Sequence, residues 1–579
     1  MRYHALATDF DGTLVHNGNV TSNTIEALKK LVASGRQLVM VTGREIPDLK
    51  AVFSELNLFR WVVAENGGLL YDPATTKELV LGPAASEKLV STLRDRGVQS
   101  ISVGKSIIAT WSPYEQIVLS AIRELGLELQ VIFNKGAVMV LPAGVNKATG
   151  LEIALKEMKL SRHNVVGVGD AENDHSFLQI VEFSAAVSNA LPGLQDAVDL
   201  ILPLSHGEGV EFLIEQILAD DLNSYRGAST RHKLPIGTNA FGDVELSAYS
   251  GPMLICGPSG SGKSTLTNRL VDVISEQAYQ FCLVDPEGDY ESFEGAVVLG
   301  GPNSEPQIDE ALHVLEQPDA NLVFCLTGVP IPERPAFFQQ LLAGLTQLRA
   351  RTGRPHWLLL DEAHHLIPAD WMPSTESLPS NWMNIVLITV QPSLLPQSIL
   401  KQVETVAIVG NDPKPFVEDF VSASDFEMPK LPTNEVLEGE ILIWTTESPP
   451  RIQQCKALKS LRQHHRHRRK YSEGQLPPDR SFYFRGANGD MNLRAQNLIL
   501  FCQLAEGIDD DTWQFHLESG DYSRWFAGSI KDDKLASAAI QIEEQKSLTP
   551  AESKKLIIDA IQRDYTLPST PAVGLPGAS

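Results

Sequence analysis

The sequence contains few cysteines, and they are spread far apart. Five occur in 579 residues, and no two have the spacing of a CxxC motif or a Cys/His zinc site. This pattern argues against a disulfide framework or a structural zinc ion, and it indicates a reducing compartment. The cysteines, most of which stand in apolar runs, are Cys256, Cys282, Cys325, Cys455 and Cys502.

Long apolar segments are also missing. No run reaches the roughly 20 residues that a membrane-spanning helix needs. The chain opens into a strand that ends at Asp9, rather than into a signal peptide. No internal repeat is visible. We therefore expect a soluble, cytoplasmic protein without membrane contact, long enough for about three or four domains.

Basic residues are in short supply. Lysine and arginine number 48 against 72 aspartates and glutamates, which gives a net charge of −24. This balance disfavours a protein whose main partner is nucleic acid. The one concentrated basic run is 462–470. A solvated linker is the favoured interpretation of that run, although binding to nucleic acid or another anion stays open.

A glycine-rich segment near the middle of the chain has the G-x-x-x-x-G-K-[ST] pattern of a phosphate loop. An apolar run, 252–256, precedes it and a helical pattern, 266–271, follows it, which is the context that this motif requires. Lys263 can reach the β- and γ-phosphates of ATP, and the Ser264 hydroxyl can hold Mg²⁺. The predicted ATP-binding residues of the loop are Gly257, Pro258, Ser259, Gly260, Ser261, Gly262, Lys263, Ser264 and Thr265.

Two later strands end in residues suited to ATP hydrolysis. The run 357–360 is followed by Asp361 and Glu362. Asp361 can hold the water shell of Mg²⁺ and Glu362 can polarise an attacking water, which favours hydrolysis over transfer to a bound hydroxyl. The strand that begins at Ile385 ends in Gln391, an amide that can sense the γ-phosphate or orient the water.

These motifs resemble the HerA/FtsK-type branch of P-loop ATPases. The matching residues are the Asp-Pro-Glu-Gly-Asp-Tyr run 285–290, Asp-Glu-Ala-His at 361–364 and Gln391-Pro-Ser. The resemblance implies a homo-oligomer, often a hexameric ring in which a neighbour supplies an arginine. No added barrel or anchor is visible, which argues against a ring-shaped DNA pump. The candidate arginines are Arg334, Arg349, Arg351 and Arg354.

The N-terminal segment carries a second set of phosphate-handling residues. Asp9 and Asp11 follow a strand at spacing i, i+2, so their side chains are expected on the same side of an extended backbone. Two such close carboxylates suggest a cation between them. Asp9 can then attack phosphorus, and Asp11 can move the proton of the leaving group. Strands ending near Thr42 and Asp170 point toward the same edge of a sheet.

The order of these motifs resembles the haloacid dehalogenase-like (HAD) phosphatases, specifically the capped, Cof-like subfamily. The resemblance implies an aspartyl-phosphate on Asp9 and phosphoryl-binding roles for Thr42 and Lys147. It also implies a Mg²⁺ site formed by Asp9, the Asp11 carbonyl and Asp170. Asn173 and Asp174 support that site, and Glu65-Asn-Gly-Gly resembles the turn into the cap. Over both sites, the predicted metal-site residues are Asp9, Asp11, Asp170, Asp174, Ser264 and Asp361.

The predicted fold class is α/β throughout, with a small, mostly α domain at the C-terminus. A HAD Rossmann-like domain with an α/β cap is followed by a P-loop NTPase domain. The expected ranges are 1–217 for the phosphatase domain, with its cap at about 81–143, 218–233 for a linker, 234–460 for the ATPase domain, 461–480 for a basic linker, 481–567 for the helical domain and 568–579 for a disordered tail.

Three functional hypotheses remain at this point. The first is a bifunctional protein in which a Mg²⁺-dependent phosphomonoester phosphatase is coupled to an ATP-hydrolysing domain. The second is a nucleic-acid-processing protein in which a motor ATPase moves DNA or RNA and the HAD domain trims phosphate ends; this pairing of domains resembles polynucleotide kinase–phosphatases. The third is a regulatory binder with a vestigial phosphatase, against which the complete motif set argues. The first hypothesis is favoured, with a small phosphorylated substrate, Mg²⁺ and ATP as ligands.

Overall fold

The computed structural model describes most of the chain. The described residues are 1–228, 231–290, 293–371, 383–432, 435–446, 450–460, 476, 480–486, 491–530, 532–545 and 547–565. The basic run 462–470 and the tail 568–579 lie outside them. The chain divides into two compact units, residues 1–458 and 459–579. The first unit contains two large sheets, and the second contains a small hairpin with helices.

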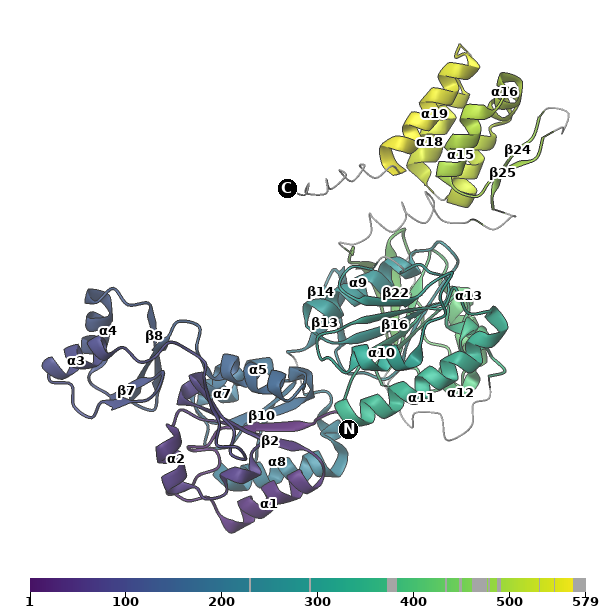
Figure 1. Ribbon diagram of the computed structural model, residues 1–579. Helices are drawn as coiled ribbons and strands as arrows, with labels where there is room; N and C mark the ends of the chain where they lie inside the picture. Colours follow the sequence, from purple (N-terminus) through teal and green to yellow (C-terminus); the bar gives the residue numbers. More distant parts are fainter. Residues whose placement is uncertain are drawn as a thin grey trace. The chain divides into compact units, whose positions relative to one another are not determined.

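An eight-stranded sheet forms the centre of the N-terminal domain, in the order β12-β11-β10-β1-β2-β3-β4-β5 (Figure 1). The strands from β12 to β3 are parallel, and β4 and β5 pair antiparallel. Their residues are apolar in unbroken runs because helices cover both faces. The strands are β1 (Ala5–Thr8), β2 (Gln37–Val41), β3 (Trp61–Ala64), β4 (Leu69–Tyr71), β5 (Glu78–Val80), β10 (Val165–Gly169), β11 (Phe183–Ala186) and β12 (Leu200–Ile201).

Helices on opposite faces of this sheet complete the domain core. In Figure 1, α5 lies on one face of the sheet and α1 and α8 lie on the other. The α8 helix ends at Asp220, inside the segment expected to be a linker. The helices are α1 (Ser22–Ala33), α2 (Ile46–Val52), α5 (Lys147–Glu157), α6 (His175–Ile180), α7 (Pro192–Gln195) and α8 (His206–Asp220).

A small α/β cap lies between β5 and α5 in the sequence. Its antiparallel sheet has the order β6-β7-β9-β8, and two helices cover one face. Alternation along β9 sends Val138 and Val140 toward those helices and Met139 and Leu141 to the other face. The cap elements are α3 (Glu87–Asp95), β6 (Ser102–Val103), β7 (Ile108–Trp111), α4 (Glu115–Glu124), β8 (Leu129–Asn134) and β9 (Ala137–Pro142).

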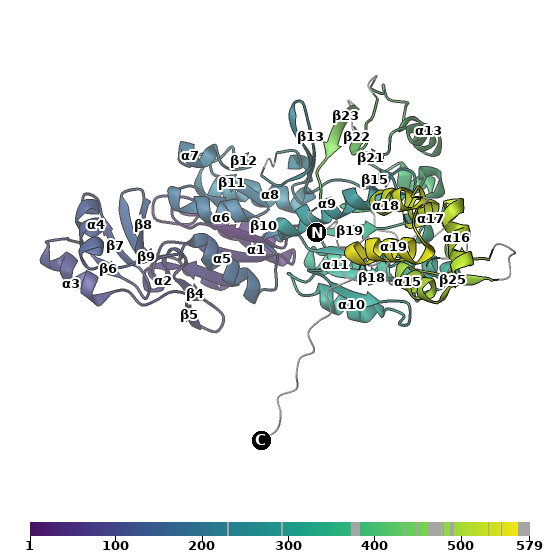
Figure 2. The same cartoon turned by 90° about the horizontal axis from the view of Figure 1, so that it is seen from above.

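The second domain is built on an eleven-stranded sheet, ordered β14-β13-β23-β22-β21-β15-β20-β19-β16-β18-β17 (Figure 2). The strands from β21 to β17 are parallel, and the other four form an antiparallel edge. The strands are β13 (Lys233–Asn239), β14 (Gly242–Ser247), β15 (Met253–Cys256), β16 (Phe281–Asp285), β17 (Val297–Gly300), β18 (Leu322–Cys325), β19 (Trp357–Leu360), β20 (Ile385–Thr389), β21 (Thr405–Val409), β22 (Glu440–Thr445) and β23 (Arg451–Ala457).

Helices cover both faces of this second sheet. The apolar side of α9 packs in one core with β15 and β16, and α10 and α11 pack in another core across the sheet. The helices are α9 (Lys263–Glu276), α10 (Ile308–Leu315), α11 (Arg334–Thr352), α12 (Gln397–Leu400) and α13 (Lys414–Ala423). The predicted α/β class is therefore confirmed for both large domains.

The C-terminal unit has its own aromatic core. Phe482, Phe501 and Tyr522 pack together there, and the imidazole of His516 lies against them. His516 accepts a hydrogen bond from the Arg485 amide and contacts Asp521, so this pair ties the hairpin to the helices. The elements are β24 (Phe482–Phe484), β25 (Leu493–Ala495), α15 (Leu498–Gly507), α16 (Asp510–Ser519), α17 (Asp521–Trp525), α18 (Asp533–Glu543) and α19 (Pro550–Tyr565).

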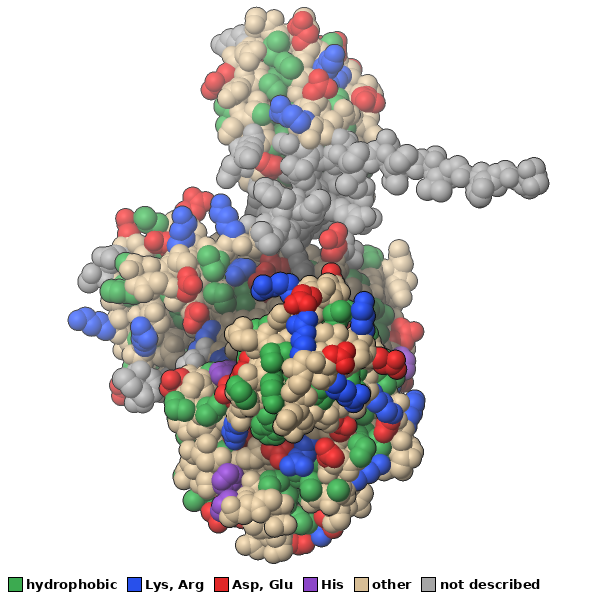
Figure 3. Space-filling view, turned by 90° about the vertical axis from the view of Figure 1, so that its left-hand side faces the viewer, with side chains coloured by type: hydrophobic (Ala, Val, Ile, Leu, Met, Phe, Trp, Pro, Cys, Tyr) green, Lys and Arg blue, Asp and Glu red, His purple; other side chains and the backbone are tan. Residues whose placement is uncertain are grey.

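The described surface mixes charges of both signs. Acidic and basic side chains are interspersed on the face shown in Figure 3. Among the described residues, no helix combines the length and the hydrophobicity that crossing a membrane requires.

Candidate active sites

Three buried carboxylates meet at the carboxyl ends of neighbouring strands in the first sheet. Because β1 pairs in parallel with β10, Asp9 and Asp170 leave the sheet side by side. Asp174 follows in the next turn. Oxygen atoms of these three side chains all lie within 4.8 Å of one another. Thr42 leaves the adjacent strand β2 at the same edge.

Lys147 places its ammonium between two of these acids. Its Nζ atom lies 2.6 Å from Asp9 Oδ1 and 2.6 Å from Asp174 Oδ1, and the side chain is fully buried. Asn146 caps α5 by accepting hydrogen bonds from Ala148 N and Thr149 N, which fixes the helix start at Lys147. Burial alone would lower the pKa of Lys147, but Asp174 and Asp9 raise it above its ordinary value.

The site holds more negative charge than its lysine neutralises. Burial, and then the nearby Asp174, raise the pKa of Asp9 well above its usual range, although Lys147 opposes the shift. Thr13 Oγ1 donates to one oxygen of Asp170 at 3.1 Å, and Lys135 of the cap forms an ion pair with the other oxygen. Oxygen ligands clustered in this way suit a hard divalent cation such as Mg²⁺.

Asp11 does not belong to this cluster of three carboxylates. It accepts both donors of Arg44, with Arg44 Nε and Nη2 each 2.7 Å from its oxygens. The expectation that Asp9 and Asp11 share one side of an extended chain stays a prediction; the backbone turns directly after Asp11, at Gly12, where φ is +87°. Arg44 stands two residues after Thr42, so its position in that motif was the signal for its place in the site.

The phosphate loop lies between β15 and α9. Gly257 and Gly262 have φ of 152° and 108°, and a Cβ at Gly257 would collide with the Val409 carbonyl oxygen. Lys263 Nζ donates to the carbonyl oxygens of Gly257 and Pro258, both at 3.0 Å, so the loop wraps around its own lysine. Burial lowers the pKa of Lys263, against the nearby Glu362 and Asp361.

Asp361 and Glu362 leave β19 near this lysine. Asp361 is buried, and its Oδ1 accepts the Glu362 amide at 3.1 Å. Glu362 has φ of +39°, an unfavourable conformation for a residue with a Cβ. Its Oε2 lies 3.5 Å from His364 Nδ1, and burial lowers the pKa of His364 to about 4. His364 is therefore neutral at pH 7.

Gln391 follows β20, the strand that lies between β15 and β19. Its position is therefore between the phosphate loop and Asp361. Its side chain is hydrogen-bonded to Asp419. The Asp419 carboxylate accepts hydrogen bonds from Gln391 Nε2 at 3.3 Å and from Ser393 N at 2.8 Å. Nothing local in the sequence singled out Asp419, which is one of two adjacent acids on α13. Asp285, in the run 285–290, accepts three amides of its own turn.

The four candidate arginines have different surroundings. Arg334 begins α11 after β18, on the edge of the sheet that carries Asp285. Arg351 forms an ion pair with Glu316 at 2.6 Å. Arg349 and Arg354 donate to main-chain carbonyls, Arg349 to Pro355 and Arg354 to Lys159 among others. These last two arginines lie at the opposite edge, beside the phosphatase domain.

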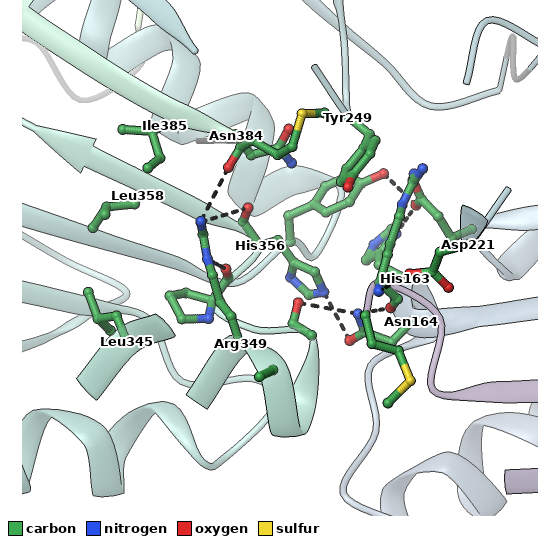
Figure 4. A pocket seen from close by; sticks show the side chains of 18 of the residues that line it. His163, Asn164, Asp221, Tyr249, Leu345, Arg349, His356, Leu358, Asn384 and Ile385 are labelled. Atoms are coloured by element: carbon green, nitrogen blue, oxygen red, sulfur yellow. Dashed lines mark hydrogen bonds and ion pairs between the residues drawn. The ribbon is translucent and has the colours of Figure 1, made fainter. Parts of the chain in front are cut away.

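The two domains meet at the amino ends of their parallel strands. His163 and Asn164 directly precede β10, and His356 directly precedes β19. A cavity of about 500 Å³ lies at this junction, away from both groups of site residues (Figure 4). In the close-up, Arg349 and Tyr249 enter it from the ATPase domain, and Asn164 and Asp221 enter from the phosphatase domain.

A second cluster of possible metal ligands at the junction is occupied by hydrogen bonds. His163, Glu182 and His232 have ligand atoms within 4.8 Å of one another. Glu182 pairs with Arg2 through one oxygen. Its other oxygen accepts from Tyr279 at 2.7 Å and lies 2.8 Å from His163 Nδ1. The geometry therefore fits a structural polar network better than a cation site.

Comparison with known proteins assigns a class to each of the two large domains. Residues 6–113 and 111–214 match the model of the haloacid dehalogenase-like hydrolases, and residues 247–397 match that of an AAA domain. The chain is 32% identical over 222 residues to a protein named Phosphoglycolate phosphatase from Methanothermobacter thermautotrophicus, covering 37% of this chain and 98% of that protein. A protein of the same name from Sulfolobus acidocaldarius is 26% identical over 224 residues, covering 38% and 98%.

A solved haloacid dehalogenase-like hydrolase from Bacteroides thetaiotaomicron is also similar, with 21% identity and a TM-score of 0.33. It covers 37% of this chain and 99% of that one. The two family matches define a fusion of two phosphate-handling α/β enzyme domains. Through its N-terminal domain, the chain belongs to the haloacid dehalogenase-like hydrolase family. The predicted joining of a HAD domain to a P-loop domain is confirmed, while the HerA/FtsK branch stays a prediction.

Proposed function

We propose that the N-terminal domain is a Mg²⁺-dependent phosphatase for a small phosphate monoester, and that the P-loop domain binds and hydrolyses ATP. The observation that supports the first part most directly is the trio of buried carboxylates around Lys147. Asp9, Asp170 and the Asp11 carbonyl would hold Mg²⁺, with Asp174 in support. Bound Mg²⁺ would neutralise charge on the phosphoryl oxygens.

The chain's own residues supply the chemistry of the proposed reaction. One oxygen of Asp9 attacks phosphorus, and the bond to the leaving oxygen breaks, which gives an aspartyl-phosphate. Asp11 donates a proton to the leaving oxygen and then takes one from the water that hydrolyses the intermediate. Thr42 and Lys147 hold phosphoryl oxygens throughout, and the buried position of Lys147 supports this role.

In the second domain, the loop 257–265 would surround the phosphates of ATP. Lys263 would exchange its bonds to Gly257 and Pro258 for bonds to phosphate oxygens. Ser264 and Asp361 would support Mg²⁺, Glu362 would polarise the attacking water, and Gln391 would sense the γ-phosphate. We further propose that ATP turnover regulates the phosphatase, and that the protein is a cytoplasmic homo-oligomer.

Hydrolysis by the full-length chain tests the phosphatase proposal. The names of the relatives support 2-phosphoglycolate as the first substrate to assay, beside p-nitrophenyl phosphate. Asp9→Asn should lower phosphate release at least 1,000-fold and leave ATP hydrolysis intact, because the nucleophile is lost from one site only. Asp95→Asn, at an exposed position on the cap, is the matched control. Full phosphatase activity in Asp9→Asn would refute the proposal.

A further inference from the structure

One face of the cap sheet is turned toward the carboxylate cluster. The strand β8 packs against the turn Glu172–Asp174. A Cβ placed on Gly43, in the loop after β2, would lie 3.2 Å from the terminal methyl carbon of Met139. Met139 belongs to an apolar group on this face with Ile107, Ala137, Leu141 and Val145. This face of the cap sheet is therefore largely apolar, and Met139 brings it close to the loop after β2.

The exception is a cation at the tip of the β8–β9 hairpin. Lys135 and Gly136 form its two-residue turn with φ of 47° and 88°, as a type I′ turn requires. A non-glycine residue is unfavourable at the first of these positions, so the choice of lysine is not explained by the turn. Lys135 reaches down to Asp170, and a Cβ on Gly12 would lie 2.8 Å from its Nζ atom.

Buried polar atoms without partners lie in the same region. Among the described residues, Asn134 Oδ1, Asn66 Nδ2 and Asn173 Oδ1 have no hydrogen-bond partner. Asn173 Nδ2 donates to Asn66 Oδ1 at 3.0 Å, so these two amides face each other beside Gly43. Buried polar groups in native proteins are normally paired, so unpaired ones around a site point to a ligand.

We propose that Lys135 is the specificity-determining residue of the phosphatase site, and that it binds a carboxylate on the leaving group of the substrate. This inference rests on the proposed function. Mg²⁺ bound to Asp170 would compete with Lys135 for that carboxylate, and the Lys135 ammonium, on a half-exposed side chain, would then be available to another anion in the site. An acid group one or two carbons from the ester oxygen then replaces Asp170 as its partner.

The apolar face of the cap sheet further restricts the class of substrate that the site can bind. Ile107, Met139 and Leu141 offer no side-chain hydrogen bonds to a ring with several hydroxyl groups, and burying such groups without partners is unfavourable. Apart from its phosphate, a short phosphorylated acid has only its carboxylate to pair. Lys135 supplies the partner for that group. Lys135 and these apolar side chains therefore favour small acidic phosphate esters, and the amides of Asn66, Asn134 and Asn173 are the remaining polar partners for the substrate.

Binding of two phosphonates tests the proposal without turnover. The probes are 3-phosphonopropionate, a non-hydrolysable mimic of 2-phosphoglycolate, and propylphosphonate, which lacks the carboxylate. Calorimetry with full-length protein and Mg²⁺ should show at least tenfold tighter binding of the acid, as expected for a charge-assisted hydrogen bond. Lys135→Asn should remove that difference, and Lys135→Arg should restore most of it. Asparagine suits the left-handed turn, so the fold is retained.

Kinetics provide the second measurement. In Lys135→Asn, kcat/KM for 2-phosphoglycolate should fall at least tenfold more than kcat/KM for p-nitrophenyl phosphate. Lys88→Ala, exposed on α3 of the cap, should change neither value. Equal losses for both probes, or no loss for either, would overturn the role of Lys135. A wild-type protein that hydrolyses no phosphate ester would instead remove the proposed function itself.

Discussion

The Nε2 atom of His163 lies 2.8 Å from the main-chain oxygen of Gln277. Arg162 donates to the same oxygen at 3.1 Å. Gln277 is the C-cap of α9, the helix that begins with Lys263 of the phosphate loop. His163 stands just before β10, the strand that ends at Gly169, one residue before Asp170. One contact thus joins an element of the ATP site to an element of the phosphatase site.

The helix α9 and the strand β10 are both regular and short enough to move as rigid bodies. A helix of 14 residues spans about 21 Å and a strand of five residues spans about 17 Å. The two candidate sites lie at the far ends of these elements, so neither domain contributes residues to the other's chemistry. Any coupling between them has to pass through the junction that includes His163 and Glu182.

We expect His163→Ala to uncouple the two activities. In the wild type, saturating ATP should change the rate of p-nitrophenyl phosphate hydrolysis at least twofold, because loading the phosphate loop shifts α9 against β10. In His163→Ala that response should disappear, while both separate activities remain measurable. Phosphate release assayed with and without ATP provides the measurement.

The control for this variant is His313→Ala, at an exposed histidine on α10. It should keep the response to ATP. A full response in His163→Ala would show that the contact with Gln277 transmits nothing, and a wild type indifferent to ATP would remove the coupling proposal altogether.

Glu182 should stabilise the chain in a pH-dependent way. Its burial alone would raise its pKa, but Arg2 and His163 hold the pKa well below 4.5. A carboxylate with a depressed folded-state pKa stabilises above its unfolded pKa, and this stabilisation is lost as the pH falls through the folded pKa. Glu182→Gln should therefore cost about 3–5 kcal/mol at pH 7, the usual cost of breaking a buried pair, and progressively less as the pH falls below 4.5.

Thermal unfolding followed by circular dichroism at pH 7 and at pH 3 measures this difference. Glu215→Gln, on the exposed side of α8, is the matched control and should leave the midpoint unchanged. A midpoint difference for Glu182→Gln that is as large at pH 3 as at pH 7 would contradict the assigned ion pairing.

The sequence was sufficient to predict the two large α/β domains and most of the residues that meet at the edges of their sheets. Asp9, Asp170 and Lys147 belong to motifs whose strand or helix context is local, and parallel pairing then brings them together. The direction of the Asp11 carboxylate was not predictable in this way. It depends on the ion pair with Arg44, which lies in the loop after β2, 33 residues further along the chain.

For a related reason, the contacts at the tip of the cap hairpin and at the domain junction could not be predicted from local sequence patterns. Lys135 is one lysine in a hairpin, and only the docking of the cap brings it to Asp170. His163 and Gln277 are 114 residues apart, and no periodicity connects them. The assignment of 218–233 as a linker followed from its polarity, yet α8 continues to Asp220, because Val210, Leu213 and Ile217 pack on the phosphatase core.

Glu362→Gln should separate ATP binding from ATP turnover. The substitution keeps the side-chain size but removes the carboxylate that is proposed to polarise water, so turnover should fall about 100-fold or more. Binding should persist, because Lys263 and the glycine loop are untouched. Nucleotide binding by calorimetry and phosphate release from ATP provide the measurements.

Glu305→Gln, at an exposed position before α10, should behave as the wild type in both ATP assays. Phosphatase activity without ATP should also be normal in Glu362→Gln, because the two sites share no residue. Unchanged ATP turnover in this variant would take Glu362 out of its proposed role.

Glu65 should determine how the cap is held over the phosphatase site. Glu65 follows directly after β3 of the core sheet. Its buried carboxylate accepts hydrogen bonds from the main-chain amides of Lys105, Ser106 and Ile107 in the cap, at 3.0, 2.8 and 3.3 Å. Glu65→Gln replaces one acceptor oxygen by an NH₂ group that faces these donors, at a cost of about 1–3 kcal/mol. Because the cap is then held less firmly, KM should rise about tenfold for 2-phosphoglycolate, with a smaller change in kcat.

A second variant approaches the same contact from the other side. A Cβ on Gly104 would lie 2.6 Å from the Glu65 carboxyl carbon, so Gly104→Ala should push the cap segment away from Glu65 and raise KM in the same direction. Glu87→Gln, at an exposed position on α3, should leave KM unchanged. If KM is normal in both Glu65→Gln and Gly104→Ala, the cap is positioned by its apolar contacts, and the carboxylate only satisfies the three amides.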